Sequence, residues 1–307
     1  LITSYAENGL LEEVLMVFKN MQMDGFIPNE ITFLALVNAC EELGGKKEGL
    51  YIHQLIVDHG LDTNAALSTA LIKMYAQFGI VSKAWGLFYK MNGRDVVAWT
   101  AVITAHVKQG FYKEAVQLFD QMKEANVKPN AFTFSIVLGA IEELSEGKSI
   151  HKNIIGSKLN GQNVVATALV NMYGRFGDLK EAQNAFNEMS KPDSMAWTTL
   201  ISVYAENGEH EVALQIFQQM QAKRIKPNAA TFSVIMSIYA ELELVKKGQE
   251  IHADMVTEGF KLDIFVENTL LNMYRKFGDL DDAYYIFNKM QQHDVVSWTT
   301  IMGSFMD

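Results

Sequence analysis

Three stretches of this 307-residue sequence place a threonine directly after a tryptophan at the start of an apolar segment. They read VVAWTAVITAHVKQG at 96–110, SMAWTTLISVYAENG at 194–208 and VVSWTTIMGSF from residue 295. An Asp directly precedes each start, and Asn130 and Asn228 follow the first two stretches. A hydroxyl can donate and accept hydrogen bonds, a carboxylate only accepts them, and a carboxamide does both. Such side chains at regular spacing favour recognition of a hydrogen-bonding ligand.

The segments that carry these side chains recur with a super-period of about 100 residues, which divides into standard, long and short units. Standard units span 96–130 and 194–228 and begin again at 295–307; long units span 30–64, 131–162 and 229–263; short units span 65–95, 163–193 and 264–294. Residues 1–29 are the tail of an earlier unit. The second long unit has lost three residues around EELSEGKSIH. We therefore expect a single continuous array over residues 1–307.

Each unit reads as two helices joined by a short turn. In GDLKEAQNAFNEM at 177–189, Asp178 and Glu181 have the spacing of a helix cap, and apolar residues then recur at helical spacing. All four prolines lie one residue before the end of a unit, where the following Asn or Asp can cap the next helix. Because so short a hairpin cannot bury its apolar face alone, neighbouring units must stack. The sequence predicts an all-α fold, an α-solenoid of stacked helix-turn-helix repeats.

Composition argues against several classes of protein. The net charge of -10 and the pI near 5.2 disfavour nucleic-acid binding through a broad basic surface. Cys40 is the only cysteine, which excludes a disulfide framework and a cysteine-built zinc site within the chain. No run approaches the roughly 18 apolar residues of a membrane span, so no membrane partner is expected. The chain lacks an initiator methionine and opens inside a unit, so we expect it to be part of a longer protein.

The unit lengths and motifs resemble the pentatricopeptide repeat (PPR) family, and within it the PLS class, which alternates standard, long and short units. The resemblance is carried by VVAWTAVI and VKPN at the two ends of a standard unit, TALVNMYGRFGDLKEAQNAFNEM in a short unit, and GKSIHKNII and GQEIHADMV in long units. It covers essentially the whole chain. The resemblance implies a right-handed superhelix of the tetratricopeptide-like helical superfamily.

The same resemblance implies sequence-selective binding of single-stranded RNA, one base per repeat, read by the fifth and last residues of a unit. Carried over to this chain, the readers are Thr69 with Asp95, Thr100 with Asn130, Thr167 with Asp193, Thr198 with Asn228, Asn268 with Asp294, and Thr299 in the incomplete last unit. An Asp suits the ring N–H of guanine or uracil, and an Asn suits the edge of adenine. The family's code then gives 5'-GAnGAnU-3' as the expected target.

Other positions are expected to contribute less uniformly. The long units should read poorly, since their pairs are Leu34 with Asn64, Ser135 with Gln162 and Ser233 with Asp263. By resemblance, Val97, Val164, Met195 and Phe265 at the second position of a unit would wedge between bases, and Lys108, Arg175 and Lys276 at the thirteenth would contact phosphate. Glu206 and Gln77 occupy the thirteenth position of two further units, so we expect modest affinity.

Structural roles compete with these functional ones. The terminal Asn and Asp residues would serve as helix caps without any RNA, and both roles can coexist. We expect Trp99, Trp197 and Trp298 to pack in the core, because each precedes its threonine by roughly 100° of helix. His53, His151 and His252 recur in the long units but lie three hairpins apart, too far for one metal ion. No metal and no other cofactor is expected.

Family members with this alternation usually recognise sites of cytidine-to-uridine RNA editing in mitochondria or plastids (chloroplasts). The resemblance therefore implies the recognition arm of an organellar RNA-editing or RNA-processing factor, with editing cofactor proteins as further partners. The chain contains neither H-x-E nor C-x-x-C, so no catalytic residue and no enzyme activity is expected in it. Two alternatives remain: a protein-binding scaffold of the tetratricopeptide kind, favoured by the negative charge, and the specificity module of a longer cytidine deaminase.

Overall fold

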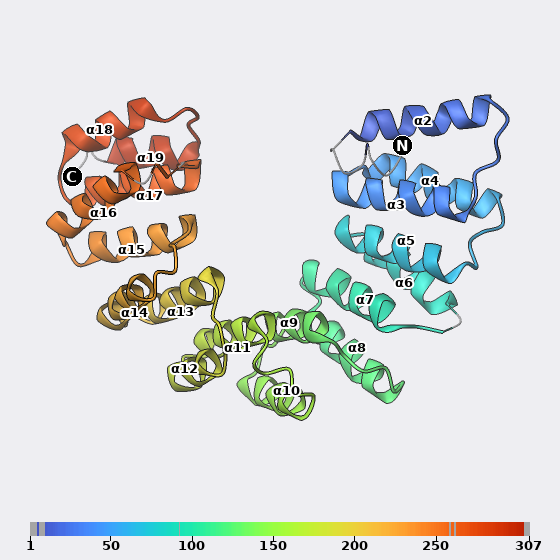
Figure 1. Cartoon of the computed structure of the whole chain (residues 1–307), viewed down its shortest axis with the longest axis horizontal. Coiled ribbons are helices and arrows are strands. Elements are labelled where there is room, and N and C mark those ends of the chain that lie inside the picture. The colour runs from blue at the N-terminus through green and yellow to red at the C-terminus, as the bar shows by residue number, and fades with distance from the viewer. Residues whose placement is uncertain (1–4, 6–9, 92, 258, 261, 304–307) are drawn as a thin grey trace. The chain divides into compact units, whose positions relative to one another are not determined.

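The protein is described by a computed structural model that covers residues 5, 10–91, 93–257, 259–260 and 262–303. Within these residues every regular element is a helix, and successive helices form hairpins (Figure 1). The all-α fold predicted from the sequence is confirmed, and the architecture is that of a helical-repeat solenoid. The chain divides into two compact modules, which are described one at a time.

The N-terminal module (Leu1–Gly156) contains one single helix and four helix pairs among its described residues. These are α2 (Leu11–Met23), then α3 (Glu30–Leu43) with α4 (Lys46–Asp58), α5 (Ala65–Gln77) with α6 (Val81–Lys90), α7 (Val96–Lys108) with α8 (Tyr112–Glu124), and α9 (Ala131–Gly139) with α10 (Leu144–Gly156). The first helices of successive pairs pack side by side, α3 on α5, α5 on α7 and α7 on α9. Each second helix packs on the first helix of its own pair.

The C-terminal module (Ser157–Asp307) repeats this arrangement, with four pairs and one further helix among its described residues. These are α11 (Asn163–Arg175) with α12 (Leu179–Asn187), α13 (Ser194–Glu206) with α14 (His210–Ala222), α15 (Ala229–Glu241) with α16 (Val245–Thr257), α17 (Ile264–Lys276) with α18 (Leu280–Lys289), and finally α19 (Val295–Gly303). Its first helices also form a row, since α11 packs on α13, α13 on α15, α15 on α17 and α17 on α19.

The first helix of a pair begins where an Asn or Asp side chain can satisfy a free backbone N–H. A cap residue accepts a hydrogen bond from the N–H three residues on at Asn29, Asn64, Asp95, Asn130, Asp193, Asn228, Asp263 and Asp294. Such a cap is worth about 1 kcal/mol. Gln162 precedes α11 without making this bond, because its longer side chain does not fit the cap geometry. The first helices from α3 to α19 thus start at the first residue of a unit recognised in the sequence.

Packing between pairs repeats an aromatic contact. The ring of Trp99 lies edge-on to Phe88 with centroids 4.7 Å apart, and Trp197 meets Phe186 in the same way at 4.8 Å. Both tryptophans are almost fully buried, as expected. Trp298 makes the same contact with Phe287, yet it is 52% exposed, contrary to the expectation. No second helix follows α19 in the described residues to cover its outer side.

The histidines of the long units also have a packing role. His53 forms a hydrogen bond through Nδ1 with the hydroxyl of Tyr75, and His252 does the same with Tyr274 at 2.9 Å. In each case the bond ties the second helix of a long unit to the first helix of the next short unit. Burial is the main cause that lowers the pKa of both histidines, so the neutral ring is favoured in the folded chain.

The three residues missing from the second long unit have a local effect. Its first helix, α9, has 9 residues, whereas α3 has 14 and α15 has 13. The second helix α10 keeps 13 residues, so the deletion removes the last turn of the first helix. Ala140 and Ile141, which follow α9, remain buried and keep the hairpin packed. The start of α9, where the predicted reader Asn130 lies, is unaffected.

Candidate nucleic-acid interface

One cavity in the N-terminal module brings together the fifth and last residues of a standard unit. It has a volume of about 670 Å³ and is lined only by first helices and the residue before α9. Thr100 of α7 and Asn130 at the start of α9 both line it, as do Val97, Lys108 and Phe132. We call this cavity the first groove. Three kinds of predicted contact residue, the base reader, the wedge and the phosphate ligand, therefore share one surface.

Asn130 divides its side chain between two tasks. Its Oδ1 accepts hydrogen bonds from the N–H of Thr133 at 2.9 Å and from the hydroxyl of Thr133 at 3.0 Å. Because both partners can donate, the network fixes which end of the carboxamide is the oxygen. The Nδ2 group makes no hydrogen bond within the described residues, and Asn130 is exposed. The oxygen caps α9, and a free N–H donor remains for a ligand.

The second standard unit repeats this geometry in the C-terminal module. Oδ1 of Asn228 accepts from the N–H and hydroxyl of Thr231 at 2.9 and 3.0 Å. The hydroxyl of Thr198 lies 3.5 Å from the same oxygen, so the fifth and last residues of the unit are neighbours. The Nδ2 of Asn228 makes no hydrogen bond in the described part of the chain. Both units therefore present the same chemical group, a carboxamide N–H.

The threonines at the fifth position differ from the sequence expectation of a side chain open to a base. Thr100 is 5% exposed and Thr198 is 4% exposed. The Thr100 hydroxyl donates to the carbonyl of Val96 and lies 2.7 Å from the Thr133 hydroxyl, and the same bonds join Thr198 to Ser194 and Thr231. Each fifth-position threonine therefore stabilises the cap residue indirectly, through the second threonine to which both are bonded. Because the fifth-position threonine is small, it leaves room beside the carboxamide of the cap residue.

The short units present carboxylates instead. Asp95 caps α7 through Oδ1, which accepts from Ala98, and its second oxygen is left without a hydrogen bond within the described ranges. In the next short unit Asp193 caps α13 in the same way, while Nδ2 of Asn163 lies 3.3 Å from its second oxygen. Thr69 and Thr167, the fifth residues, are half-buried. These units offer an acceptor where the standard units offer a donor.

The third short unit has the most closely joined pair. Nδ2 of Asn268 donates to both oxygens of Asp294, at 3.1 and 3.2 Å. Hydrogen bonds from the N–H of Ser297 and from Asn268 hold the pKa of Asp294 below its usual range, so this carboxylate stays ionised. Asn268 is only 8% exposed. Thr299, the fifth residue of the following unit, is exposed, and its hydroxyl donates to the carbonyl of Val295.

The predicted wedge residues all lie on the surface. Val97 is 42% exposed, and Val164, Met195 and Phe265 are 55 to 62% exposed. Val97 lines the first groove, and Phe265 lines a smaller cavity of about 310 Å³ in the C-terminal module. A large exposed apolar side chain beside a polar reader is suited to contact with the face of a base.

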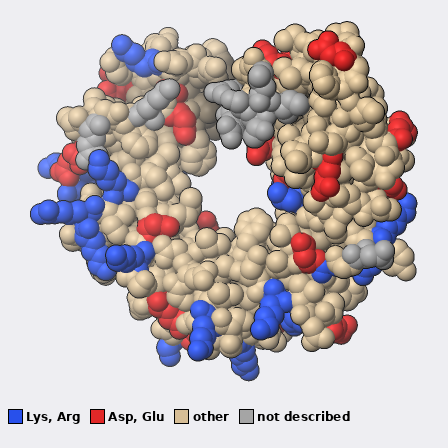
Figure 2. All heavy atoms as spheres, turned by 45° about the vertical axis from the view of Figure 1, so that its right-hand side comes forward, with Lys and Arg blue, Asp and Glu red and all other residues tan. Residues whose placement is uncertain are grey.

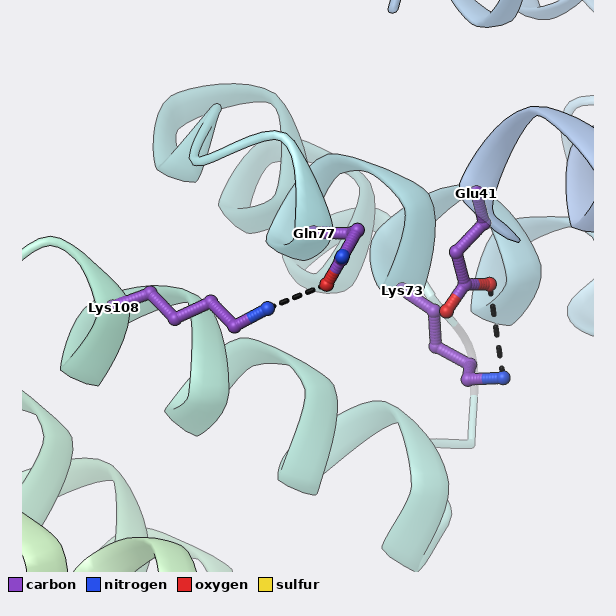
Figure 3. A network of polar contacts seen from close by, with 4 residues as sticks. All are labelled: Glu41, Lys73, Gln77 and Lys108. Carbon is purple, nitrogen blue, oxygen red and sulfur yellow. Dashed lines mark hydrogen bonds and ion pairs between the residues drawn. The ribbon is translucent and has the colours of Figure 1, made fainter. Parts of the chain in front are cut away.

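Lysines in the first groove are held by polar neighbours on adjacent first helices. Figure 3 shows Lys108 of α7 reaching the side-chain oxygen of Gln77 on α5, while Lys73 of α5 pairs with Glu41 of α3 at 3.8 Å. Burial raises the pKa of Glu41, and Lys73 and Lys108 act against this rise. The first groove thus contains two ammonium groups and one carboxylate whose charge is costly to bury.

The corresponding positions elsewhere carry mixed charge. Arg175 and Lys276 lie at the ends of α11 and α17, and both are exposed. Glu206 lines the smaller cavity together with His210 and Glu241, and Nε2 of His210 lies 3.1 Å from the Glu241 carboxylate. On the face seen in Figure 2, blue and red atoms are interspersed and most of the surface is uncharged. This face therefore offers a polyanion local contacts rather than a broad basic surface.

The long-unit pairs contribute little to this pattern. Asn64 and Asp263 serve as helix caps, Ser135 donates to the carbonyl of Phe132, and the hydroxyl oxygen of Ser233 is buried without a partner in the described chain. Within the described residues no group of three or more His, Cys, Asp and Glu side chains is arranged to hold a metal ion. No helix in the same ranges combines the length and apolar character needed to cross a bilayer.

Sequence reasoning missed three residues that line the first groove, Glu41, Lys73 and Phe132, and the buried Thr133 that bonds to Asn130. The signal for Thr133 was present, since a threonine follows the terminal Pro-Asn of a unit by three residues in PNEIT, PNAFT and PNAAT. Thr32 makes the same two bonds to Asn29 as Thr133 makes to Asn130. Glu41 and Lys73 lie on different helices, and their spacing in the sequence gives no sign that they meet.

Rows of helix pairs that align hydrogen-bonding side chains along their first helices define the class of helical-repeat solenoids that bind extended ligands. Profiles of the PPR repeat family match residues 94–141 and 192–241, a pentatricopeptide repeat domain profile matches 250–305, and a PPR repeat profile matches 1–26, 67–96, 164–191 and 230–260. The chain belongs to the pentatricopeptide repeat family.

Curated relatives from Arabidopsis thaliana share this membership. The chain is 34% identical to pentatricopeptide repeat-containing protein At1g03540 over 95% of its length, covering 48% of that protein. It is 33% identical to the mitochondrial protein At2g03380 and 32% identical to the chloroplastic protein At1g15510, over 99% and 97% of its length and 45% and 35% of theirs. The chain thus spans about half the length or less of these relatives, and the names of two of them carry the organellar location implied by the resemblance.

Solved structures agree on the fold. The crystal structure of the pentatricopeptide repeat protein PPR10 from maize superposes with a TM-score of 0.71 at 20% identity, over 99% of this chain and 50% of that chain. The structure of PPR10 in complex with an 18-nt psaJ RNA element gives a TM-score of 0.69 at 19% identity, over 99% of this chain and 52% of that one.

Proposed function

We propose that this chain binds single-stranded RNA in a sequence-selective manner, with the last residue of each standard and short unit facing one base. The supporting observation is the divided use of the cap side chain. Oδ1 of Asn130 caps α9, and Nδ2 of Asn130 is a free donor in the first groove. A free carboxamide N–H fits the N1 acceptor of adenine, and the free carboxylate oxygen of Asp95 fits the ring N–H of guanine.

The proposal resolves the competition between cap and reader. A helix cap needs only an acceptor, and both Asn and Asp supply one. The cap alone therefore gives no reason for Asn in the standard units and Asp in the short ones, whereas base reading does. The similar protein PPR10 has been solved in complex with an 18-nt psaJ RNA element, and this supports RNA as the ligand here.

The proposed target is 5'-GAnGAnU-3', read by the units between residues 65 and 294. Thr69 with Asp95 and Thr167 with Asp193 would select guanine, Thr100 with Asn130 and Thr198 with Asn228 adenine, and Asn268 with Asp294 uracil. In the last pair the larger Asn268 lies against Asp294, which leaves less room for a purine. The long units would add spacing and little selectivity.

A fluorescence anisotropy titration tests this function. The labelled oligonucleotide 5'-GACGACU-3' should bind at least tenfold more tightly than a scrambled sequence of the same composition, since each good base contact is worth about 1 to 3 kcal/mol. Equal binding of both oligonucleotides would reject selective recognition. Binding to neither would favour the alternative, a protein-binding scaffold of the tetratricopeptide kind.

We further propose that the chain is the recognition arm of an organellar RNA-editing or RNA-processing factor. The relatives named mitochondrial and chloroplastic support the location, and the repeated cap residues with one free polar atom support recognition as its task. Organelles without the full-length protein should lose cytidine-to-uridine conversion, or processing, next to a site that the array selects in vitro. Unchanged transcripts at every selected site would reject this role.

A further inference from the structure

A second cavity in the N-terminal module lies between the second helices α4 and α6 and the start of α5. Its volume is about 380 Å³, and it shares no lining residue with the first groove. Lys83, Gly86 and Lys90 of α6 line it opposite His53 of α4. Asp62, in the loop before α5, is the only carboxylate in its described lining. We call it the lysine cavity.

The positive charge of the lysine cavity is only partly compensated, because two lysines face the single carboxylate of Asp62. Lys83 and Lys90 are seven residues apart on α6, so both lie on one side of the helix. Neither forms an ion pair with a carboxylate within the described residues. Nζ of Lys83 lies 5.7 Å from the ring centroid of Tyr75, whose hydroxyl bonds to His53. Burial, Lys83 and Lys90 lower the pKa of His53 while Asp62 raises it, so these charges all act on the same ring.

The other two sets of units provide an internal comparison. The histidine and tyrosine recur as His151 with Tyr173 and as His252 with Tyr274. At the place of Lys83 the later sets have Glu181 and Asp282, at the place of Gly86 they have Asn184 and Tyr285, and at the place of Lys90 they have Glu188 and Lys289. All three sets share the histidine and tyrosine, but only the first set combines them with two lysines and a glycine.

In the later sets, carboxylates influence the tyrosine of the shared histidine–tyrosine pair, whereas in the first set lysines influence the histidine of that pair. Burial, together with Glu181, Asp178 and Glu188, raises the pKa of Tyr173 to about 12. Tyr274 is affected in the same way by burial and Asp282. Burial alone raises the pKa of Tyr75 to about 12, so the contrast lies in the charged neighbours: carboxylates replace both lysines in the second set and one in the third, and an anion would be attracted less there than in the lysine cavity.

We propose that the lysine cavity binds a small molecule or chain end that carries a phosphate monoester. Two ammonium groups facing one cavity suit a dianion, which a single carboxylate would not match in charge. In the tautomer in which Nδ1 of His53 accepts from the Tyr75 hydroxyl, Nε2 carries the ring proton and can donate to a phosphate oxygen. Val57, Leu87 and Met91 supply an apolar wall for the rest of the ligand.

Gly86 keeps the cavity open. A Cβ built at this position would meet no atom within 4 Å, so packing does not require a glycine here. The helical glycine Gly49 contrasts with it, because a Cβ there would lie 2.5 Å from the sulfur of Met74. A larger side chain at residue 86 would thus project into the lysine cavity without disturbing α6, and the corresponding residue of the third set, Tyr285, is an exposed aromatic side chain on an intact helix.

Isothermal titration calorimetry with adenosine monophosphate and with inorganic phosphate tests the site on the 307-residue chain. The double variant Lys83→Glu/Lys90→Glu copies the second set, and Gly86→Tyr copies the third, so both should keep the helices, which circular dichroism verifies. The wild type should bind adenosine monophosphate, and the double variant should bind it roughly tenfold more weakly. Gly86→Tyr should weaken the nucleotide more than inorganic phosphate, because it fills space without removing charge.

The control variant Lys246→Glu/Lys289→Glu changes net charge by the same amount on exposed residues of the C-terminal module. It should bind adenosine monophosphate as the wild type does. Equal weakening of adenosine monophosphate binding in both double variants would show that net charge alone causes the effect, and this would overturn the proposal. The proposal would also be overturned if the wild type bound neither adenosine monophosphate nor inorganic phosphate.

Two oligonucleotides distinguish the source of the phosphate. If a 5'-phosphorylated RNA binds more tightly than its 5'-hydroxyl form, and Lys83→Glu/Lys90→Glu removes the difference, the ligand is an RNA end. If both forms bind alike while adenosine monophosphate gives a titration, the ligand is a free phosphorylated molecule. Because the lysine cavity and the first groove share no residue, the double variant should retain selectivity for 5'-GACGACU-3' in either case.

Discussion

The two standard units have the same polar network in surroundings of opposite charge. In both, a threonine at the fifth position supports an Asn cap that keeps one N–H free, with bond lengths that agree within 0.1 Å. Lys108 and Lys73 line the same cavity as Asn130, together with one carboxylate, Glu41. The thirteenth residue of the second unit is Glu206, and the cavity that it lines also contains Glu241.

The difference in charge between the two units separates two properties of RNA binding, the choice of base and the affinity. The identity of the base would depend on the free atom of the cap residue, which is the same in both units. The contribution to affinity would depend on the charge along the first helices, which differs. The chain should therefore select adenine at both standard units but hold the RNA backbone more firmly in the N-terminal module.

The largest effect is expected from exchanging the reading atom. Asn130→Asp and Asn228→Asp each replace the free N–H by a carboxylate oxygen, so preference at the matching base should move from adenine to guanine. Binding competition with oligonucleotides that differ at one base should show a change of about 1 to 3 kcal/mol.

Both substitutions retain an acceptor for the helix cap. The urea midpoint of each variant should therefore stay close to that of the wild type, which separates reading from stability. If base preference is unaltered in both variants, the cap is the only role of these residues. If only one variant changes its preference, the two units are not equivalent readers.

Much of this comparison follows from the sequence, and some of it does not. The starts of the first helices were predictable, because Asn or Asp at the end of a unit is a local signal for a cap. The burial of Thr100 was not predictable, since its hydroxyl partner Thr133 comes from the next unit along the chain. The exposure of Trp298 was not predictable either, since it shares its motif and its aromatic contact with the buried Trp99 and Trp197.

Exchanging charge between the two units should give the next largest effect. Lys108→Glu should weaken RNA binding and Glu206→Lys should strengthen it, each by about 1 kcal/mol, because both residues are near the surface. Anisotropy titrations at several salt concentrations should show the slope of log K against log salt change by about 0.7 for each phosphate that is newly bound or released.

Base preference serves as the control in these titrations. It should be the same in Lys108→Glu, Glu206→Lys and the wild type, because the cap network is untouched. A change in selectivity without a change in salt dependence would contradict the separation of the two properties.

A smaller effect is expected from removing the threonine hydroxyl that bonds to the cap residue in each network, Thr133 in the first and Thr231 in the second. Thr133→Val and Thr231→Val preserve side-chain shape and the backbone N–H, so Oδ1 of the cap residue keeps one donor. Each variant should lose roughly 0.5 to 1 kcal/mol of stability in urea unfolding. The two losses should be similar, since the networks are alike; unequal losses would show that the modules support their caps differently.

The smallest effect concerns the carboxylate of the first groove. Since burial raises the pKa of Glu41, the folded chain holds a proton there at a pH where the unfolded chain has released it. The stability that this proton contributes is present at low pH and is lost as the pH rises through the pKa of the folded chain. Glu41→Gln should therefore raise the free energy of unfolding, measured in urea, by less than about 0.5 kcal/mol at pH 7 and by progressively less toward pH 5.

The same variant tests RNA binding. As the pH falls from 7 to 5, RNA affinity should rise more in the wild type than in Glu41→Gln, because protonation removes a negative charge beside Lys73. A parallel pH dependence in both chains would mean that ionisation of Glu41 does not influence RNA binding in the first groove, and that the charge contrast with the second standard unit rests on Lys73 and Lys108.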